Sequence, residues 1–336
     1  MDTITHTVLG AAVGEVILGK KIGKKAMLWG AIFSNFPDID VASHFFMDPI
    51  DGLLAHRGFT HSILFSCLLI PLMTFLFFNI YKKYSTTYFD WIKLFSITLF
   101  SHLFLDSLTS YGTGLLEPFS HQRFSFNTIF VADPFYTFPL LVCTIALLIL
   151  KNQSKYRKAW TNAGLIISSM YIIFTFINKY HVDKVMDNSL KNQKHSYSKM
   201  MTTPTPLNNI LWNSIAKNDS GYWIGYYSLL DRKEEVNYFF IRRNDSLISN
   251  EIKEPNIQKL IRFSQGYYCI TQEDNINYFH DLRFGETGSW DNEESKFTFS
   301  YRLGENQDES MFLQKGRLQG PLKETFSKLL ERIKGR

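Results

Sequence analysis

An unbroken apolar run, SILFSCLLIPLMTFLFFNIY (62–81), constrains the fold of this chain more than any other feature. About 20 mostly apolar residues in a helix are needed to cross the hydrocarbon core of a bilayer. A single segment in that environment must pair all its backbone groups internally, which a helix allows. The run therefore predicts a membrane helix, and HRGFTH (56–61) puts two histidines and an arginine at its start.

Further apolar segments lie on both sides of this run. Three are long enough to span and two shorter ones come first: 91–108, 134–150, 160–178, 4–19 and 25–36. Gly/Ala-rich composition, as in the first of the short segments, is typical of tightly packed membrane helices. We therefore expect residues 1–180 to form a mainly α polytopic membrane domain of about six helices.

The second half of the chain contains no apolar run of that length. Residues 181–220 are polar and include TTPTP, which predicts a linker. Residues 221–336 carry aromatic-rich alternating segments such as GYWIGYYSLL and end in an amphipathic helical pattern. We expect a small α+β soluble domain there. Three cysteines without paired or metal-ligand spacing predict no disulfide framework.

Basic residues alternate between the expected turns. Lysines and arginines cluster in 20–25, 82–93 and 151–158, whereas the connections 37–61 and 109–133 carry one arginine each. Cytoplasmic loops are enriched in Lys and Arg, so six spans would leave both termini and the soluble domain outside the cytoplasm. The first residues lack the basic region of a signal peptide, so we expect no cleavage.

The same assignment gathers ionisable residues at one membrane face. His102 and Asp106 lie one helical turn apart on a shared face. The full set is His6, Asp38, Asp40, His56, His61, His102 and Asp106. Each also has a structural interpretation, such as a turn or cap for Asp38 and Asp40 or a simple hydrogen bond for His102 with Asp106. Ionisable residues inside apolar helices are nevertheless costly and usually functional.

Four histidines and three aspartates on one face predict a metal site. Imidazole nitrogen and carboxylate oxygen suit Zn²⁺ first, with Mn²⁺ or Fe²⁺ as alternatives. Seven ligands exceed one tetrahedral shell, so we expect one or two ions, with Asp38 or Asp40 as bridging and catalytic carboxylates. Two-metal centres commonly act on phosphate. Arg57 is a third catalytic candidate that would bind a substrate phosphate, or else a membrane-interface anchor.

Five motifs resemble, in order and spacing, the membrane-bound metal-dependent hydrolases, a family of LexA-regulated proteins associated with the inner membrane. They are MDTITH, FPDID, HRGFTHS, SHLFLDSLTSYGTGLLEPFS and VADPFYTFPLL. The resemblance covers about residues 1–180 and implies a helical membrane domain with metal-dependent hydrolytic activity. It also implies Asp2 and Asp133 as residues behind the ligands. For Asp133, which precedes a proline, a helix N-cap is the favoured alternative.

Together these observations predict a hydrolase of the bacterial inner membrane, acting on a phosphoester or lipid headgroup at the outer face. We expect membrane lipids as partners and no nucleic acid; the oligomeric state is left open. Two alternatives remain. A divalent-cation transporter or channel would also place His and Asp within the membrane. A membrane-anchored binding module would instead leave activity to the soluble domain.

Overall fold

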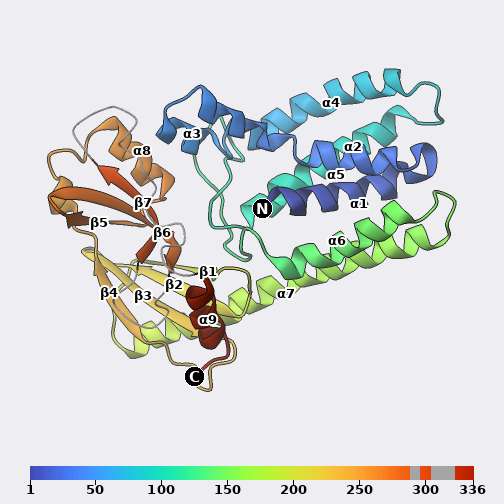
Figure 1. Ribbon diagram of the computed structural model, residues 1–336. Coiled ribbons are helices and arrows are strands. Elements are labelled where there is room, and N and C mark those ends of the chain that lie inside the picture. Colours follow the sequence, from blue (N-terminus) through green and yellow to red (C-terminus); the bar gives the residue numbers. More distant parts are fainter. Residues whose placement is uncertain (288–295, 304–321) are drawn as a thin grey trace. The chain divides into compact units, whose positions relative to one another are not determined.

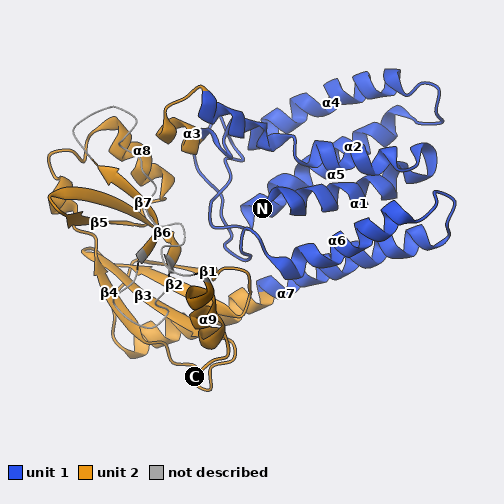
Figure 2. Cartoon of the chain, viewed as in Figure 1, with its two compact units in different colours: residues 1–45, 55–176 blue, residues 46–54, 177–336 orange. Residues whose placement is uncertain are grey.

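The computed structural model describes residues 1–287, 296–303 and 322–336, which form two compact units (Figure 2). Unit 1 comprises Met1–Phe45 and Ala55–Phe176, and unit 2 comprises Phe46–Leu54 and Ile177–Arg336. The long helix α7 (Tyr156–Asn192) runs covalently from the first unit into the second.

Unit 1 is a helix bundle. Its other long elements are α1 (Thr3–Ile22), α2 (Lys25–Ser34), α4 (Ile63–Ile80), α5 (Tyr88–Ser107) and α6 (Pro134–Ile149). Two 3₁₀ segments, η1 (Pro37–Phe45) and η2 (Phe59–His61), follow α2 in this unit, whereas α3 (Pro49–Ala55) between them in sequence lies almost wholly in unit 2. Figure 1 shows α1, α2 and α5 between α4 on one side and α6 and α7 on the other.

The helix starts follow from short polar side chains that accept hydrogen bonds from free backbone N–H groups. Asp2 caps α1 and Ser62 caps α4. Thr87 and Asp90 form a reciprocal capping box at the start of α5. Asp133 caps α6 immediately before a proline at the first helical position. These caps fix where each helix begins and thereby where the polar residues beside it lie.

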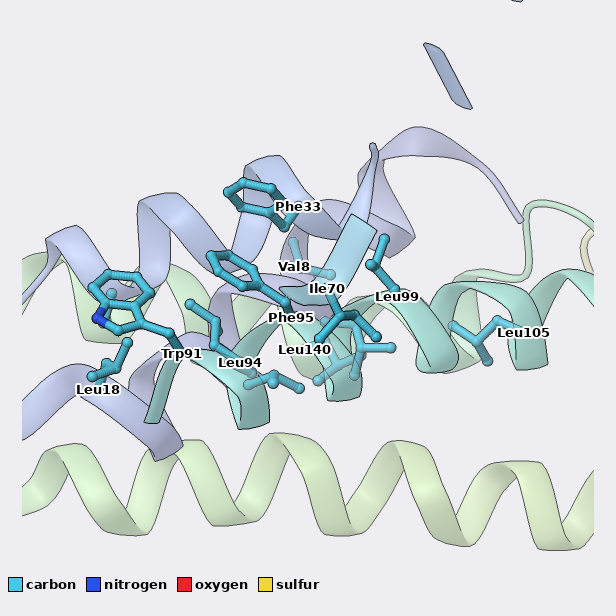
Figure 3. Packing of buried hydrophobic residues seen from close by; sticks show 14 of the residues in the cluster. Val8, Leu18, Phe33, Ile70, Trp91, Leu94, Phe95, Leu99, Leu105 and Leu140 are labelled. Carbon is cyan, nitrogen blue, oxygen red and sulfur yellow. The ribbon is translucent and has the colours of Figure 1, made fainter. Parts of the chain in front are cut away.

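The core of the bundle is built on α5. Trp91, Leu94, Phe95 and Leu99 are fully buried. The ring of Phe95 lies 4.3 Å from that of Phe33 in α2. Figure 3 shows these side chains packed with residues of α1, α4 and α6. These four apolar residues of α5 therefore contact neighbouring helices and not lipid.

Helices α1 and α2 cross in backbone contact at glycines. A Cβ atom on Gly10 would lie 2.3 Å from the carbonyl oxygen of Gly30, and one on Gly14 would lie 2.1 Å from that of Ala26. Only glycine permits such an approach, which is the usual role of small residues four apart in membrane helices. The crossing brings the start of α1 next to the end of α2, where Ser34 donates to the carbonyl of His6 at 2.6 Å.

Replacing Gly10 by alanine is expected to lower the free energy of unfolding by about 2 kcal/mol, since the added methyl group overpacks the crossing. Alanine favours helices more than glycine does, which offsets part of the cost. The measurement is thermal unfolding in detergent. Val16→Leu is the control, because Val16 is 57% exposed on the same helix. A Gly10→Ala protein as stable as wild type would contradict the close crossing.

The prediction of six membrane helices is wrong. Within the part of the chain that the structure describes, two helices are long and apolar enough to span a bilayer, α4 and α7. Helix α6 is apolar but has 16 residues, and α2 has only 10. At 1.5 Å per residue these are about 24 and 15 Å long, short of a bilayer core of about 30 Å.

The apolar runs of α1 and α5 have a different origin. Both helices carry charged residues, such as Glu15 in α1 and Asp90 in α5, and bury many of their apolar side chains inside the bundle. By contrast, Leu68, Leu72 and Phe75 of α4 are at least 60% exposed. A sequence run cannot distinguish a protein-facing from a lipid-facing helix. With two spans, the count of basic residues over six alternating turns no longer orients the chain.

Unit 2 is built on two antiparallel sheets. One has the order β1-β2-β3-β4 and the other the order β5-β6-β7. The strands are β1 (Lys199–Pro204), β2 (Leu211–Lys217), β3 (Gly221–Ser228), β4 (Tyr238–Arg242), β5 (Tyr268–Glu273), β6 (Ile276–Thr287) and β7 (Lys296–Leu303). The helices are η3 (Asp245–Ile248), α8 (Pro255–Phe263) and α9 (Leu322–Ile333).

Residues 181–220, expected to form a linker, are ordered elements instead. They contain the end of α7 and strands β1 and β2. The polar side chains that suggested a linker are held by hydrogen bonds. Asn208, for example, accepts from the backbone N–H groups of Ile210 and Leu211. A helical region thus precedes a sheet unit, as the sequence predicted, but without a flexible connection of that length.

His280 in β6 makes unit 2 sensitive to acid. Its ring lies 2.7 Å from the hydroxyls of Thr271 and Ser300, and burial lowers its pKa to about 4. A depressed pKa means that stability present above the unfolded value of about 6.5 is lost as pH falls toward 4. We expect β5 and β6 to lose about 2 kcal/mol of protection between pH 7 and 5. Hydrogen exchange measures this, and His280→Gln should abolish the loss.

Candidate metal centre

The ionisable residues gather at one end of the bundle in unit 1. His6 comes from α1, His102 and Asp106 come from the last turns of α5, and Asp38 and Asp40 come from η1. His56 follows α3, and His61 ends η2 one residue before the N-cap of α4. Four of them are fully buried: His6, His61, His102 and Asp106.

Four ligand atoms converge on one point. His61 Nε2 lies 3.0 Å from His102 Nε2, 3.4 Å from Asp38 Oδ1 and 3.4 Å from Asp106 Oδ2. His102 Nε2 lies 3.7 Å from Asp38 Oδ1 and 3.5 Å from Asp106 Oδ2. Metal–ligand distances of about 2.0–2.2 Å in a tetrahedral site place neighbouring ligand atoms about 3.3–3.6 Å apart. Three of the five separations fall in this range, and the other two, 3.0 and 3.7 Å, lie within about 0.3 Å of it.

Hydrogen bonds fix which ring nitrogen of each histidine faces the cluster. His102 Nδ1 lies 2.7 Å from the carbonyl oxygen of Ser34, which can only accept, so this nitrogen carries the proton. His61 Nδ1 lies 3.0 Å from Asp40 Oδ2. Both rings therefore turn Nε2 toward the centre of the cluster. This arrangement, with the outer nitrogen held by a carbonyl or carboxylate, is usual for metal-binding histidines.

Asp106 presents one oxygen to the cluster. Its Oδ2 is buried and accepts no hydrogen bond, although Nε of Arg57 lies 3.2 Å away as an ion-pair partner. Its other oxygen, Oδ1, accepts from the amino group of Met1 and lies 3.1 Å from His6 Nε2. A buried carboxylate oxygen that accepts no hydrogen bond is stabilised by a nearby cation. The residues present therefore fit a divalent ion bound by His61, His102, Asp38 and Asp106.

His6 was predicted as a metal ligand, and the structure brings it to the edge of the cluster. Its ring stacks on that of His102 with centroids 3.8 Å apart. Its nearer nitrogen contacts Asp106 Oδ1 and not the convergence point. The geometry gives His6 the role of orienting a ligand carboxylate.

A second group shares Asp38 with the first. Ligand atoms of Asp38, Asp40 and His56 all lie within 4.8 Å of one another. The side chains of Asp38 and His56 are 20% and 22% exposed, so this group faces the outside of the bundle. Three ligands with an open side are typical of catalytic sites, whereas closed four-ligand shells are typical of structural ones. Asp38 is positioned to bridge the two groups.

Asp40 organises the loop between η1 and η2. Its Oδ2 accepts from the backbone N–H of Arg57 at 2.9 Å and from the hydroxyl of Thr60 at 2.8 Å. Its Oδ1 lies 2.9 Å from His56 Nδ1. Burial raises the pKa of Asp40, but the rings of His56 and His61 outweigh burial and hold the pKa well below its usual range. Asp40 is therefore ionised across the physiological pH range.

The field around His61 favours a positive charge at the centre of the cluster. Burial lowers the pKa of His61, but hydrogen bonding with Asp106, Asp38 and Asp40 outweighs burial and raises the pKa to about 10. A group of carboxylates that retains a proton this strongly also attracts a divalent cation, which competes with that proton for the ring nitrogen.

Arg57 was predicted to bind a substrate phosphate, but its guanidinium lies behind Asp106. Arg57 is buried, Nη1 donates to Thr109 at 2.7 Å, and Nε lies 3.2 Å from Asp106 Oδ2. Its backbone adopts a positive φ of 59°, which is uncommon for a residue other than glycine. This conformation presents its N–H to Asp40 while its side chain turns to Asp106.

Sequence reasoning did not identify the residues that support the ligands. Arg123 donates from both terminal nitrogens to the carbonyl of His56, at 3.1 and 3.2 Å. Tyr111 packs edge-on against His56 and under the guanidinium of Arg57. The motif SYGTG and the basic residue after it were visible in the sequence, but no signal there indicated their contacts.

Asp2 and Asp133, predicted behind the ligands, cap helices. Asp2 accepts from Thr5 in α1. Asp133 accepts from Phe135 and from the hydroxyl of Tyr171, each at 2.9 Å. The favoured alternative for Asp133, an N-cap, is what the geometry gives. Neither carboxylate contacts the four converging ligand atoms in any recorded hydrogen bond or ion pair of the described residues.

Comparison with known proteins places the helical unit in a family. The family model described as YdjM inner membrane protein matches residues 1–182, which include every candidate ligand. This chain belongs to the YdjM inner membrane protein family. The match confirms the inner-membrane part of the resemblance, and the exposed apolar faces of α4 and α7 agree with it. Hydrolytic activity stays a prediction.

Two curated relatives extend the comparison. Inner membrane protein YbcI of Escherichia coli (strain K12) is 32% identical over 123 residues, covering 36% of this chain and 69% of that protein. The uncharacterized protein YfhP of Bacillus subtilis (strain 168) is 29% identical over 208 residues, covering 58% of this chain. The match spans only 57% of the length of YfhP. No solved structure matches significantly.

Proposed function

We propose that this membrane protein is a metal-dependent hydrolase of phosphoesters, either soluble or carried by a lipid headgroup. One observation supports the proposal most: four ligand atoms converge at separations near those of a tetrahedral shell, and three of them belong to fully buried side chains. The adjoining open group of Asp38, Asp40 and His56 adds a place where substrate and ligands would meet. Zinc suits this donor set first, and manganese or iron are the alternatives.

The candidate residues would have three roles: to bind metal, to position the ligands and to accept a proton. His61, His102, Asp38 and Asp106 would hold one ion, and Asp38, Asp40 and His56 a second. A bound divalent ion supplies Lewis-acid activation of water and of a phosphoryl oxygen. Arg57 and His6 hold Asp106, while Arg123 holds the loop of His56. Asp38, which is partly exposed, is the carboxylate best placed to accept a proton from water.

Hydrolysis of a phosphoester at this site would exchange one P–O bond for another. The oxygen of water forms a bond to phosphorus, and the bond from phosphorus to the leaving alkoxide oxygen breaks. The proton released by water passes to Asp38, and the alkoxide leaves as an alcohol after taking up a proton. No oxidant or further reactant is required.

Cation transport, the alternative, would require ligands that continue through the bundle. Between His6 and Glu15, α1 carries no histidine or acidic residue, and between Lys93 and His102, α5 carries none either. The first acidic residue beyond His6 along α1 is therefore Glu15, which is already paired with Arg157. A site at one end suits chemistry at a surface better than passage across the membrane. That this end faces the outside of the cytoplasm stays a prediction.

The test is hydrolysis of p-nitrophenyl phosphate by the full chain purified in detergent. Activity should disappear when divalent metal is removed and return with zinc, manganese or iron. Asp38→Asn should lower kcat by about 100-fold or more. The matched control is His121→Ala, because His121 is an exposed histidine paired with Glu117 and not with a candidate ligand. Activity that persists after complete metal removal would refute the proposal.

A further inference from the structure

Exposed apolar side chains of unit 1 lie in η1 and η2, and in the loop whose Gly114 N–H donates to the carbonyl of Arg57. This apolar rim consists of Ile39, Val41, Phe45, Phe59, Leu116 and Phe119, which are between 43% and 83% exposed. Phe45 and Phe119 are each 83% exposed. Single exposed apolar residues are ordinary on protein surfaces, but a group of this size marks an interaction site.

In segment η1, candidate metal ligands alternate along the sequence with exposed apolar residues of the rim. Asp38 and Asp40 turn toward the histidines, whereas Ile39 and Val41 between and after them are 59% and 49% exposed. The segment therefore has a charged inner face and an apolar outer face. Such a segment is stable where its outer face meets an apolar phase and its inner face meets protein.

The rim is continuous with the start of the membrane-spanning helix α4. The ring of Phe59 lies edge-on to Phe65 of α4, with centroids 5.7 Å apart. The backbone N–H of Ile63, the first residue of α4, donates to the carbonyl of Leu115 at 3.0 Å, which ties Leu116 to the same place. Along α4 the exposed apolar surface continues through Leu68 and Leu72. The surface that meets lipid along α4 thus extends onto the rim.

We propose that the apolar rim lies in the boundary between headgroups and acyl chains, and that the substrate is a phosphoester in the headgroup of a membrane lipid. Asp38 and His56, the partly exposed members of the cluster, lie within three residues of rim residues in sequence. A headgroup could reach them while its acyl chains stay in the bilayer. The substrate assignment rests on the proposed function, whereas the location of the rim does not.

The location is tested with nitroxide labels in vesicles of phosphatidylethanolamine and phosphatidylglycerol. Cys67 in α4 is the exposed native cysteine and gives the bilayer reference. In a Cys67→Ser background, Phe45→Cys tests the rim, and Lys233→Cys, at an exposed loop of unit 2, gives the water reference. The Phe45 label should collide with oxygen more than with a polar nickel chelate, as the Cys67 label does. Collision rates equal to those at Lys233 would overturn the proposal.

The substrate class is tested with two monoesters. Phe45→Ser/Phe119→Ser should hydrolyse soluble p-nitrophenyl phosphate at the wild-type rate, but phosphatidic acid in vesicles about tenfold more slowly. Equal rates on vesicle-borne phosphatidic acid for variant and wild type would overturn the lipid assignment. Wild-type protein that cleaves neither ester would refute the proposed function, and the label measurement would still decide where the rim lies.

Discussion

Replacing His102 by alanine is expected to lower the affinity of the chain for zinc by at least about 100-fold. The substitution removes one of four converging ligand atoms and leaves Asp106 Oδ2, already without a hydrogen-bond donor, facing an incomplete shell. Asp106→Asn should have a similar effect, because an amide oxygen is a weaker ligand than a carboxylate. Metal content by mass spectrometry and titration against a competing chelator provide the measurement.

Graded substitutions separate ligands from the residues that hold them. His6→Gln should cost about 10- to 100-fold in affinity, less than His102→Ala, because His6 contacts Asp106 Oδ1 and not the centre. His121→Ala should leave affinity unchanged. A correctly folded His102→Ala protein with wild-type metal content would contradict the metal proposal. The four converging residues, two histidines and two aspartates, would then form a structural hydrogen-bond network.

The candidate ligands could be found from the sequence because of where they fall. His61 precedes an apolar run, and His102 and Asp106 end one, positions at which ionisable side chains are conspicuous. Their convergence also needed few assumptions, since each lies at a helix end. The supporting contacts could not be found in this way. The acceptor for His102 is the backbone carbonyl of Ser34, a group that every residue possesses.

The number of spans was mispredicted for a physical reason. Hydrophobic length records that a segment avoids water, but not whether lipid or protein surrounds it. Trp91 and Phe95 make α5 apolar, yet both side chains are fully buried among other helices. Helix α2 owes its apolar residues to the same core and ends after 10 residues. Its partner α1 can pack against it only because glycines allow backbone contact.

Helix α1 links two polar sites that differ in kind. His6 near its start belongs to the metal centre, and Glu15, nine residues later, pairs with Arg157 of α7. At 1.5 Å per residue the two sites are about 13 Å apart along the helix. Around His6 the Asp106 carboxylate is shared by several groups, the Met1 amino group, the Arg57 guanidinium and the converging histidines. At Glu15 one carboxylate pairs with one guanidinium, so the pair has no net charge that would attract a metal ion.

Replacing Arg157 by methionine is expected to lower the free energy of unfolding by about 3–5 kcal/mol. Arg157 donates to both oxygens of Glu15, at 2.7 and 2.6 Å, and the two side chains are 5% and 10% exposed. It also donates to the carbonyls of Leu147 and Leu150 at the end of α6. Methionine fills a similar volume but leaves the carboxylate and these carbonyls buried without donors.

The double variant Glu15→Gln/Arg157→Met shows whether the loss of unfolding free energy in Arg157→Met comes from the unpaired, buried carboxylate of Glu15. Because an uncharged amide is cheaper to bury than a carboxylate, the double variant should regain about 2 kcal/mol over Arg157→Met alone. Chemical unfolding in one detergent gives all three stabilities. Metal affinity of the folded fraction should stay at the wild-type value, since Glu15 lies away from the ligands. A single variant within about 1 kcal/mol of wild type would mean that water reaches the Glu15–Arg157 pair.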